Sequence, residues 1–198
     1  NKQGFDYFFG YLNQTLAHNY YPETLWKNEE ITRLEKGTYS PNLFQKEVEQ
    51  FILQEKDKPF FIYYPTILPH ANNELTRKTG NGMEVPANEP YTNENWTIQQ
   101  KNYAAMVSLL DKQVGQIVEL LKKLKIEKNT ILMFMSDNGP QAKVEGGYDQ
   151  TLFQSNGGLR GIKRTLYEGG IRSPLIVEWT GKIKPNKEVT TAWTQYDL

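Results

Sequence analysis

The sequence predicts an α/β fold in which a mostly parallel sheet is flanked by helices. Three short, nearly continuous apolar runs have the composition of buried strands, and they lie at 60–64, 131–135 and 174–179. A long amphipathic helix is predicted at about 97–125, between the first two runs. Strand, helix and strand in this order are typical of a parallel sheet with a crossover helix on one face.

The composition restricts the class of protein. The chain has 198 residues, of which 38% are hydrophobic and 13% aromatic, as in a globular domain with a substantial core. Lys plus Arg and Asp plus Glu both number 23, so no general basic field favours nucleic acid as a partner. The sequence contains no cysteine, which excludes disulfides, thiolate metal sites and cysteine nucleophiles within it. Its apolar runs are far too short to predict a membrane span.

The other elements are indicated by local signals. Ser40 and Pro41 suit the start of a helix, Ser as the cap and Pro in the first turn, and residues 56–59 end it. Residues 71–95 form a polar stretch rich in Asn, Gly, Glu and Pro. Such a long connection is usually functional or mobile, so we expect a loop that shapes a pocket.

Polar residues follow the first two predicted strands. His70 comes just after the first, and Asp137 and Asn138 come directly after the second. In parallel sheets ligands bind outside the carboxyl ends of strands, so both groups are expected at the same end. Asp137 and Asn138 offer hard oxygen donors of the kind that calcium and magnesium prefer. The alternative for this pair is an ordinary turn, where Asp, Asn and Gly are common.

The chain has two histidines, His18 and His70. Histidine is the usual proton donor near neutral pH, which makes His70 a candidate catalytic or substrate-binding residue. His18 is a weaker candidate for lining a substrate pocket. For each of them the alternative is a packing or surface role.

Lys163 lies in a glycine-dense stretch at 157–170, where the backbone could approach a ligand closely. A lysine there can neutralise an anionic substituent, although an ordinary exposed lysine is the alternative. The stretch and its flank are locally basic, and Glu168 is expected to form an ion pair with one of the arginines. These arginines are Arg160, Arg164 and Arg172.

Taken together in order and spacing, these segments resemble the type I sulfatases of the alkaline phosphatase superfamily. The resemblance covers essentially the whole chain, and its last block is the most specific. The matching segments are residues 4–10, residues 59–64 leading to Pro69 and His70, Asp111, residues 136–139, and residues 159–174.

The resemblance implies hydrolysis of sulfate monoesters, on sulfated sugars, by a formylglycine-dependent calcium enzyme with an alkaline-phosphatase-like fold. Asp137 and Asn138 would be two of the calcium ligands. Lys163 would contact the sulfate, and His70 would lie near the leaving-group oxygen, either protonating it or binding sulfate. By the same resemblance the protein is expected in a periplasmic, extracellular or lysosomal location.

Several family features are missing from these residues. The family's formylglycine arises from the first residue of a Cys (or Ser)-x-Pro-x-Arg motif, which does not occur here. The paired aspartates that complete the calcium site and the Gly-Lys-x-His segment are also absent. We therefore expect 1–198 to be the central and C-terminal portion of a sulfatase catalytic domain, truncated at both ends and without the C-terminal subdomain. Such a chain would be inactive alone.

Two other functions remain open at this point. One is a phosphomonoester or phosphonate hydrolase of the same superfamily, which would need a different nucleophile and usually more metal ligands. The other is a non-catalytic scaffold that binds sulfated glycans.

Overall fold

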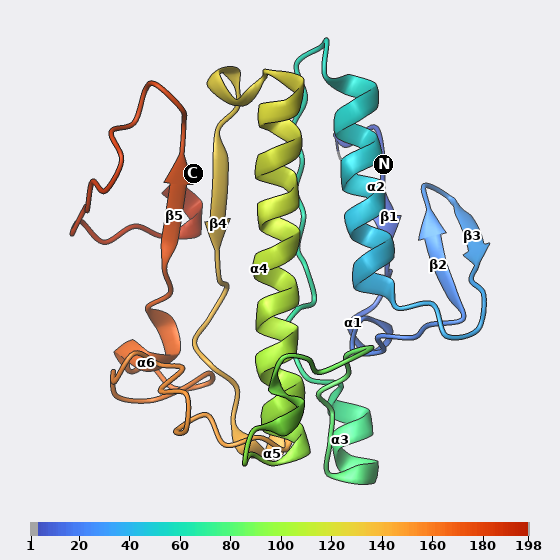
Figure 1. Ribbon diagram of the computed structural model, residues 1–198, viewed down its shortest axis with the longest axis vertical. Coiled ribbons are helices and arrows are strands. Elements are labelled where there is room, and N and C mark those ends of the chain that lie inside the picture. Colours follow the sequence, from blue (N-terminus) through green and yellow to red (C-terminus); the bar gives the residue numbers. More distant parts are fainter. Residues whose placement is uncertain (1–3, 198) are drawn as a thin grey trace.

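The computed structural model describes residues 4–197, and two long helices form its centre (Figure 1). Helix α4 lies beside α2, a small sheet lies beyond α2, and a two-stranded sheet lies on the other side of α4. The helices are α1 (Gln14–Ala17), α2 (Ser40–Glu55), α3 (Asn73–Thr79), α4 (Ile98–Leu124), α5 (Lys143–Gly146) and α6 (Glu168–Ile171). The strands are β1 (Phe9–Gly10), β2 (Thr24–Lys27), β3 (Glu30–Arg33), β4 (Leu132–Met135) and β5 (Leu175–Glu178). Short 3-10 turns occur at Tyr91–Asn93, Glu127–Asn129 and Gln195–Asp197.

Helix α4 confirms the predicted long helix almost to the residue. Thr97 caps it: its hydroxyl accepts from the Gln100 amide at 3.3 Å, and the Gln100 side chain accepts from the Thr97 amide at 2.9 Å. This reciprocal pair satisfies two backbone donors that the first turn would otherwise leave free. The helix ends where Lys125 takes a left-handed conformation with φ of 60°. Among the described residues, no helix combines the length and the apolar character needed to cross a membrane.

Helix α2 has the predicted bounds, but Ser40 does not cap it. Tyr39 is the N-cap residue and makes no side-chain capping bond. The Ser40 hydroxyl is buried, donates to the carbonyl of Tyr20 at 3.1 Å and accepts from the hydroxyl of Tyr11 at 2.7 Å. Because a buried hydroxyl needs partners, these tertiary bonds take the place of the cap.

The strands predicted at 131–135 and 174–179 are confirmed as β4 and β5, but they pair antiparallel, with Leu132 opposite Glu178. The other sheet, β1–β2–β3, is also antiparallel, and its short hairpins were not predicted. Within residues 4–197 all the paired strands are therefore antiparallel, and a mostly parallel sheet is not confirmed.

Residues 60–64 are extended but form no strand. Their burial alternates: Phe61 and Tyr63 are 73% and 71% exposed, while the residues between and beside them are half-buried. The segment runs beside α4 in the same direction as β4, so its direction is that of the predicted parallel crossover (Figure 1). The prediction of a strand is wrong for the described chain because no other strand of residues 4–197 pairs with it.

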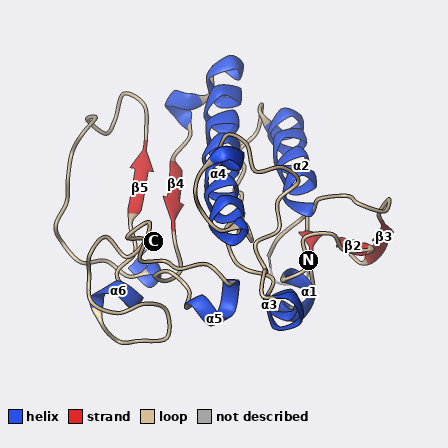
Figure 2. Ribbon diagram, turned by 60° about the horizontal axis from the view of Figure 1, so that its bottom comes forward, coloured by secondary structure: helices blue, strands red, loops and turns tan. Residues whose placement is uncertain are grey.

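The predicted loop at 71–95 contains a helix, α3, that was not predicted. Asn72 caps it by accepting from the Leu75 amide at 3.0 Å, and Gly80 ends it in a left-handed conformation. A capping Asn and a terminal Gly at this spacing are the usual boundary signals of a helix. Loops and short helices gather at one end of the molecule, around α3, α5 and α6 (Figure 2).

The core lies at this same end. It is formed by buried aromatic and apolar side chains: Tyr20, Tyr39, Leu68, Ala71, Met83, Met106 and Tyr148. The buried hydroxyl of Tyr20 donates to the carbonyls of Ile67 and His70, at 2.9 and 2.5 Å. The core therefore supports the backbone of His70 directly.

Met106→Ala tests the importance of this core. Met106 is fully buried, with 0% exposure, whereas its neighbour Val107 is 40% exposed. We expect Met106→Ala to lower the free energy of unfolding by about 2–5 kcal/mol, because it removes buried surface and leaves a cavity. Val107→Ala, the matched control, should change it by less than about 0.5 kcal/mol. Chemical denaturation measures both; similar values for the two variants would contradict this assignment of the core.

Candidate active site

The loop at 136–141 connects three distant parts of the chain. It begins at the carboxyl end of β4. The carbonyl of Pro140 accepts from the Lys163 amide at 3.0 Å, and the side chain of Gln141 accepts from the Ala71 amide at 3.1 Å. Two backbone positions, one next to His70 and one at Lys163, are thereby fixed to the residues that follow Asp137 and Asn138. This confirms that the ends of the first two predicted strand segments lie together.

Glycine lets the backbone of this loop pack against α6. The amide of Gly139 donates to the carbonyl of Gly170 at 3.0 Å. A Cβ at Gly139 would lie 1.9 Å from the carbonyl oxygen of Gly169, and one at Gly169 would lie 2.2 Å from that of Gly161. Neither position can accept a larger side chain without backbone movement. At these positions glycine serves close approach of backbone to backbone, whereas the glycines of 157–170 were expected to let the backbone approach a ligand.

The hydrogen bonds of His70 determine its tautomer. Its Nδ1 lies 2.8 Å from the carbonyl oxygen of Ala71, and since a carbonyl only accepts, Nδ1 carries the proton. In the neutral ring Nε2 is then an unprotonated acceptor. Nε2 lies 3.2 Å from Nζ of Lys163, whose ammonium group donates to it. The neutral ring therefore accepts a hydrogen bond from a cation.

The electrostatics of the site favour this neutral form. Burial lowers the pKa of His70 below its ordinary value of 6.5, and the nearby Lys163 and His18 lower it further. The bond to Ala71 and the charge of Glu145 act in the opposite direction without reversing the shift. His70 thus holds no proton on Nε2 near neutral pH unless a bound anion restores one.

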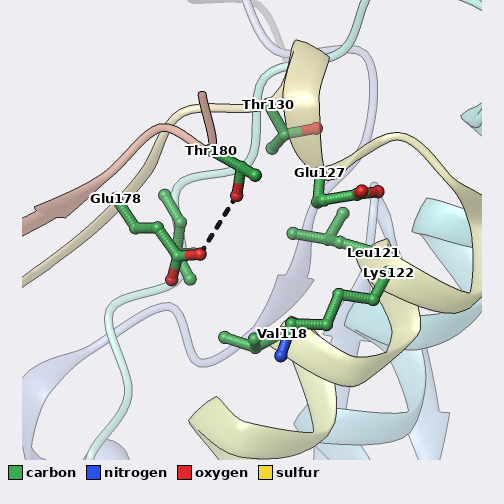
Figure 3. Close-up of a pocket in the computed structure, with 8 residues that line it drawn as sticks. Val118, Leu121, Lys122, Glu127, Thr130, Glu178 and Thr180 are labelled. Carbon is green, nitrogen blue, oxygen red and sulfur yellow. Dashed lines mark hydrogen bonds between the residues drawn. The ribbon is translucent and has the colours of Figure 1, made fainter. Parts of the chain in front are cut away.

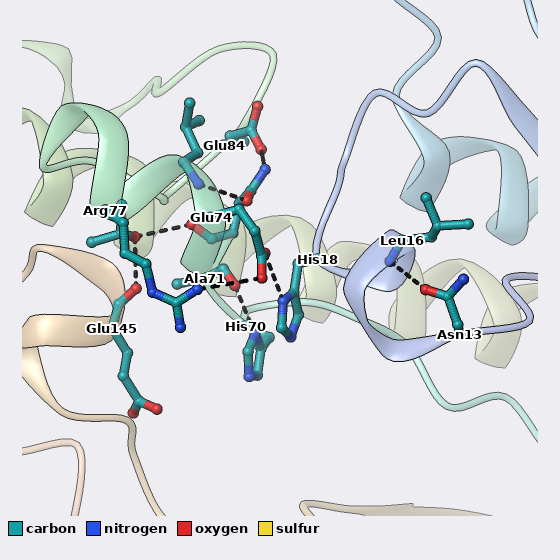
Figure 4. A network of polar contacts seen from close by, with 12 residues as sticks. Asn13, Leu16, His18, His70, Ala71, Glu74, Arg77, Glu84 and Glu145 are labelled. Atoms are coloured by element: carbon teal, nitrogen blue, oxygen red, sulfur yellow. Dashed lines mark hydrogen bonds and ion pairs between the residues drawn. The ribbon is translucent and has the colours of Figure 1, made fainter.

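His18 stacks on His70. The ring centroids are 5.0 Å apart and the planes differ by 6°. Nδ1 of His18 lies 2.8 Å from a carboxylate oxygen of Glu74 in the first turn of α3 (Figure 4). The His18 side chain is only 13% exposed. The structure therefore brings together all three predicted substrate-facing residues, His18, His70 and Lys163.

Asp137 and Asn138 follow β4 directly, as predicted. Asp137 is exposed and Asn138 half-buried. The amide nitrogen of Asn138 donates to the carbonyl of Gly139 at 3.0 Å, which leaves the harder amide oxygen for another partner. The pair fits a hard cation by its donor chemistry. Within residues 4–197, however, no three His, Cys, Asp or Glu side chains cluster as a complete metal site would require.

The arginines near Lys163 have partners of their own. Arg172 pairs with Glu168 at 3.4 Å, which confirms the expected ion pair. Arg164 pairs with the buried Glu145 at 2.7 Å. The guanidinium of Arg160 lies over the ring of Tyr167, 3.8 Å from its centroid. Lys163 differs from them because its described side-chain bond is to a histidine.

Two residues of this end of the molecule were missed from the sequence. Glu74 and Gln141 join segments 56 and 70 residues apart in the chain. Local patterns carry no signal for such pairs, although the helix boundary signals around α3 would have placed Glu74 in a first turn.

A small hollow lies at the opposite end of α4 and is unrelated to the histidines. It is lined by residues of α4, the following turn and the end of β5, and Thr180 donates to Glu178 at its edge (Figure 3). Its lining includes Lys122, Glu127 and Glu178, but none of the predicted site residues lies there. We assign no chemistry to it.

Comparison with known proteins identifies the family. The family model described as Sulfatase matches residues 1–198. The chain belongs to the sulfatase family. An N-acetylgalactosamine-6-O-sulfatase of Bacteroides thetaiotaomicron is 30% identical over 184 residues, which are 88% of this chain and 30% of that protein. The human N-acetylgalactosamine-6-sulfatase is 32% identical over 145 residues, 71% of this chain and 24% of that protein.

Solved sulfatase structures share the fold. The structure of Ps i-CgsB in complex with k-i-k-neocarrahexaose superposes with a TM-score of 0.65 at 27% identity. The match covers 91% of this chain and 41% of that one. The neighbours imply an alkaline-phosphatase-like α/β fold. The present chain spans about a third of the length of the curated relatives that it matches.

The lowered pKa of His70 predicts how stability depends on pH. Between the folded pKa and 6.5 the unfolded chain binds more protons than the folded chain, so stability falls as the pH is lowered through this range. His70→Gln cannot be protonated and should lose this contribution. Thermal melts at pH 7.5 and about 5.5 should show a smaller loss of Tm for His70→Gln than for the wild type. Equal losses in both proteins would argue against a neutral, buried His70.

Proposed function

We propose that the protein containing this chain hydrolyses sulfate monoesters, and that its substrates are sulfated sugars. The observation that carries the proposal is the contact between Lys163 and His70 beside the Asp137–Asn138 loop, in a chain of the sulfatase family. A cation, a histidine and hard oxygen donors are what cleavage of an anionic ester requires.

The chemistry follows from where charge develops. Breaking the bond between sulfur and the bridging oxygen leaves negative charge on that oxygen. Fixed donors that already point at this charge stabilise it without reorganisation. Lys163 would donate to the sulfate oxygens in place of its bond to His70. The anion would then favour protonation of His70 at Nε2, and this proton would pass to the leaving oxygen.

The proposed reaction also requires a calcium ion and a formylglycine, neither of which is among the described side chains. Asp137 and Asn138 would hold a calcium ion with ligands from elsewhere in the protein, since calcium takes about six to eight oxygens. Bound there, calcium would supply positive charge that stabilises the anionic ester. A formylglycine would supply the nucleophile from a part of the protein beyond these residues. We therefore expect no measurable turnover from residues 1–198 alone.

The substrate class rests on the relatives. Two of them are named for 6-sulfated N-acetylgalactosamine, and one solved neighbour holds a carrageenan oligosaccharide. Sulfated sugars thus occur in the names of several similar proteins, and we propose them as the substrate class of the present protein.

A pair of substrates separates this proposal from its alternatives. The whole protein should release sulfate from 4-nitrophenyl sulfate at least about 10²-fold more efficiently than phosphate from 4-nitrophenyl phosphate. The reverse preference would indicate a phosphomonoesterase. Turnover of neither ester, combined with binding of a sulfated sugar, would indicate a non-catalytic scaffold.

Lys163 and His70 should both be required for turnover. In the whole protein, Lys163→Met and His70→Ala should lower kcat/KM for 4-nitrophenyl sulfate by about 10²–10⁴-fold, because each removes a donor at the developing charge. Lys182→Met, at an exposed lysine, is the matched control and should retain wild-type activity. Circular dichroism shows whether the variants fold. A folded variant with near-normal kcat/KM would refute the role given to that residue.

Asp137 should contribute to calcium affinity. Asp137→Asn removes a charged ligand and should weaken calcium binding to the whole protein at least about tenfold. Asp57→Asn is the control, since that carboxylate is 83% exposed just past α2. Isothermal titration calorimetry gives both affinities without depending on activity. Equal calcium affinity in Asp137→Asn and the wild type would remove Asp137 from the metal site.

A further inference from the structure

The side chains of Lys163, His70, His18 and Glu74 form a row. Lys163 bonds His70, and His70 stacks on His18. His18 in turn bonds Glu74 (Figure 4). The row has a cation at one end and a carboxylate at the other. The proposed chemistry uses only Lys163 and His70. His18 and Glu74 have no part in it.

Glu74 is held on a rigid support. The helix that carries it is tied to α5, because the hydroxyl of Thr76 donates to the carbonyl of Glu145 at 2.6 Å. The capping residue Asn72 also donates to the carboxylate of Glu84 at 2.7 Å. Burial alone would raise the pKa of Glu74, but the bond to His18 and the charge of Arg77 lower it overall, so the carboxylate is ionised at neutral pH.

An ionised carboxylate fixes the ring of His18. Since it can only accept, Nδ1 of His18 carries the proton and Nε2 is the free ring nitrogen. The side-chain hydrogen bond described for His18 within residues 4–197 is the one at Nδ1. Parallel stacking on His70 then limits the ring's tilt. A histidine fixed at one nitrogen and stacked on a sulfate-facing histidine is suited to contact a ligand with the other.

We propose that His18 contacts the sugar of the substrate next to the ester, and that Glu74 is the positioning residue that sets its tautomer and orientation. The proposal rests on the proposed sulfatase function. The row places the ester at Lys163 and His70 and the uncharged sugar beyond them, at His18. In the neutral ring the unprotonated Nε2 accepts a hydrogen bond from a sugar hydroxyl. His18 would thereby contribute to selection of the sugar rather than to cleavage of the ester.

Two substrates test this assignment in the whole protein. One is N-acetylgalactosamine 6-sulfate, and the other is 4-nitrophenyl sulfate, which has the ester but no sugar. For His18→Ala and Glu74→Ala, kcat/KM for the sugar sulfate should fall at least about tenfold more than for the aryl sulfate, mainly through KM. Glu74→Gln keeps an acceptor for Nδ1 and should recover part of the loss. Losses of equal size on both substrates, or no loss on either, would overturn the proposal.

Arg77→Ala is the matched control. It removes the other ion-pair partner of Glu74, 3.7 Å away and 75% exposed, and leaves the bond to His18 in place. Its ratio of the two kcat/KM values should equal that of the wild type. A shift as large as that of Glu74→Ala would assign the effect to α3 as a whole instead of to the histidine.

Nitrogen NMR separates failure of this proposal from failure of the proposed function. In the whole protein labelled with ¹⁵N-histidine, His18→Gln and His70→Gln variants assign the resonances of these two residues. The wild type should show His18 protonated at Nδ1, and Glu74→Ala should lose this signature while His70 keeps its own. Addition of N-acetylgalactosamine 6-sulfate should shift Nε2 of His18 even in an inactive protein. An unchanged tautomer in Glu74→Ala, or an unmoved Nε2 resonance at saturating sugar, would contradict the proposal.

Discussion

The candidate site depends on the backbone of the loop at 136–141. One carbonyl of this loop accepts from the amide of Lys163, and one side chain accepts from the amide of Ala71. These two bonds explain how Lys163 and His70, 93 residues apart in the chain, come within 3.2 Å of each other. The same loop carries Asp137 and Asn138, so its position determines the relation between the predicted metal ligands and the predicted sulfate contacts.

The site is organised by hydrogen bonds to groups that can only accept. A backbone carbonyl directs one ring nitrogen of His70, and a carboxylate directs one ring nitrogen of His18. The second nitrogen of His70 thereby faces Lys163, and the second nitrogen of His18 is left for recognition. Burial keeps His70 neutral beside a lysine, an arrangement that an arriving anion would reverse. The ligand would thus supply the charge that prepares the site for catalysis.

The sequence predicted the features that depend on local patterns. Helix α4 and strands β4 and β5 follow from periodicity, and His70 and Asp137 follow from positions at the ends of apolar runs. Pairing was less predictable, because the direction of a strand and its partner depend on distant chain segments. Residues 60–64 have the composition of a strand yet pair with no other strand within residues 4–197, and β4 pairs antiparallel. Glu74 was missed for the same reason: its partner His18 lies 56 residues away.

The most direct test of this account is a crystal structure of the whole protein with N-acetylgalactosamine 6-sulfate bound. The proposed function predicts a sulfate oxygen within hydrogen-bond distance of Nζ of Lys163, with Nε2 of His70 facing the bridging oxygen. It also predicts a metal ion on Asp137 and Asn138. A sulfate group bound elsewhere on the protein, with Lys163 and His70 still bonded only to each other, would contradict it.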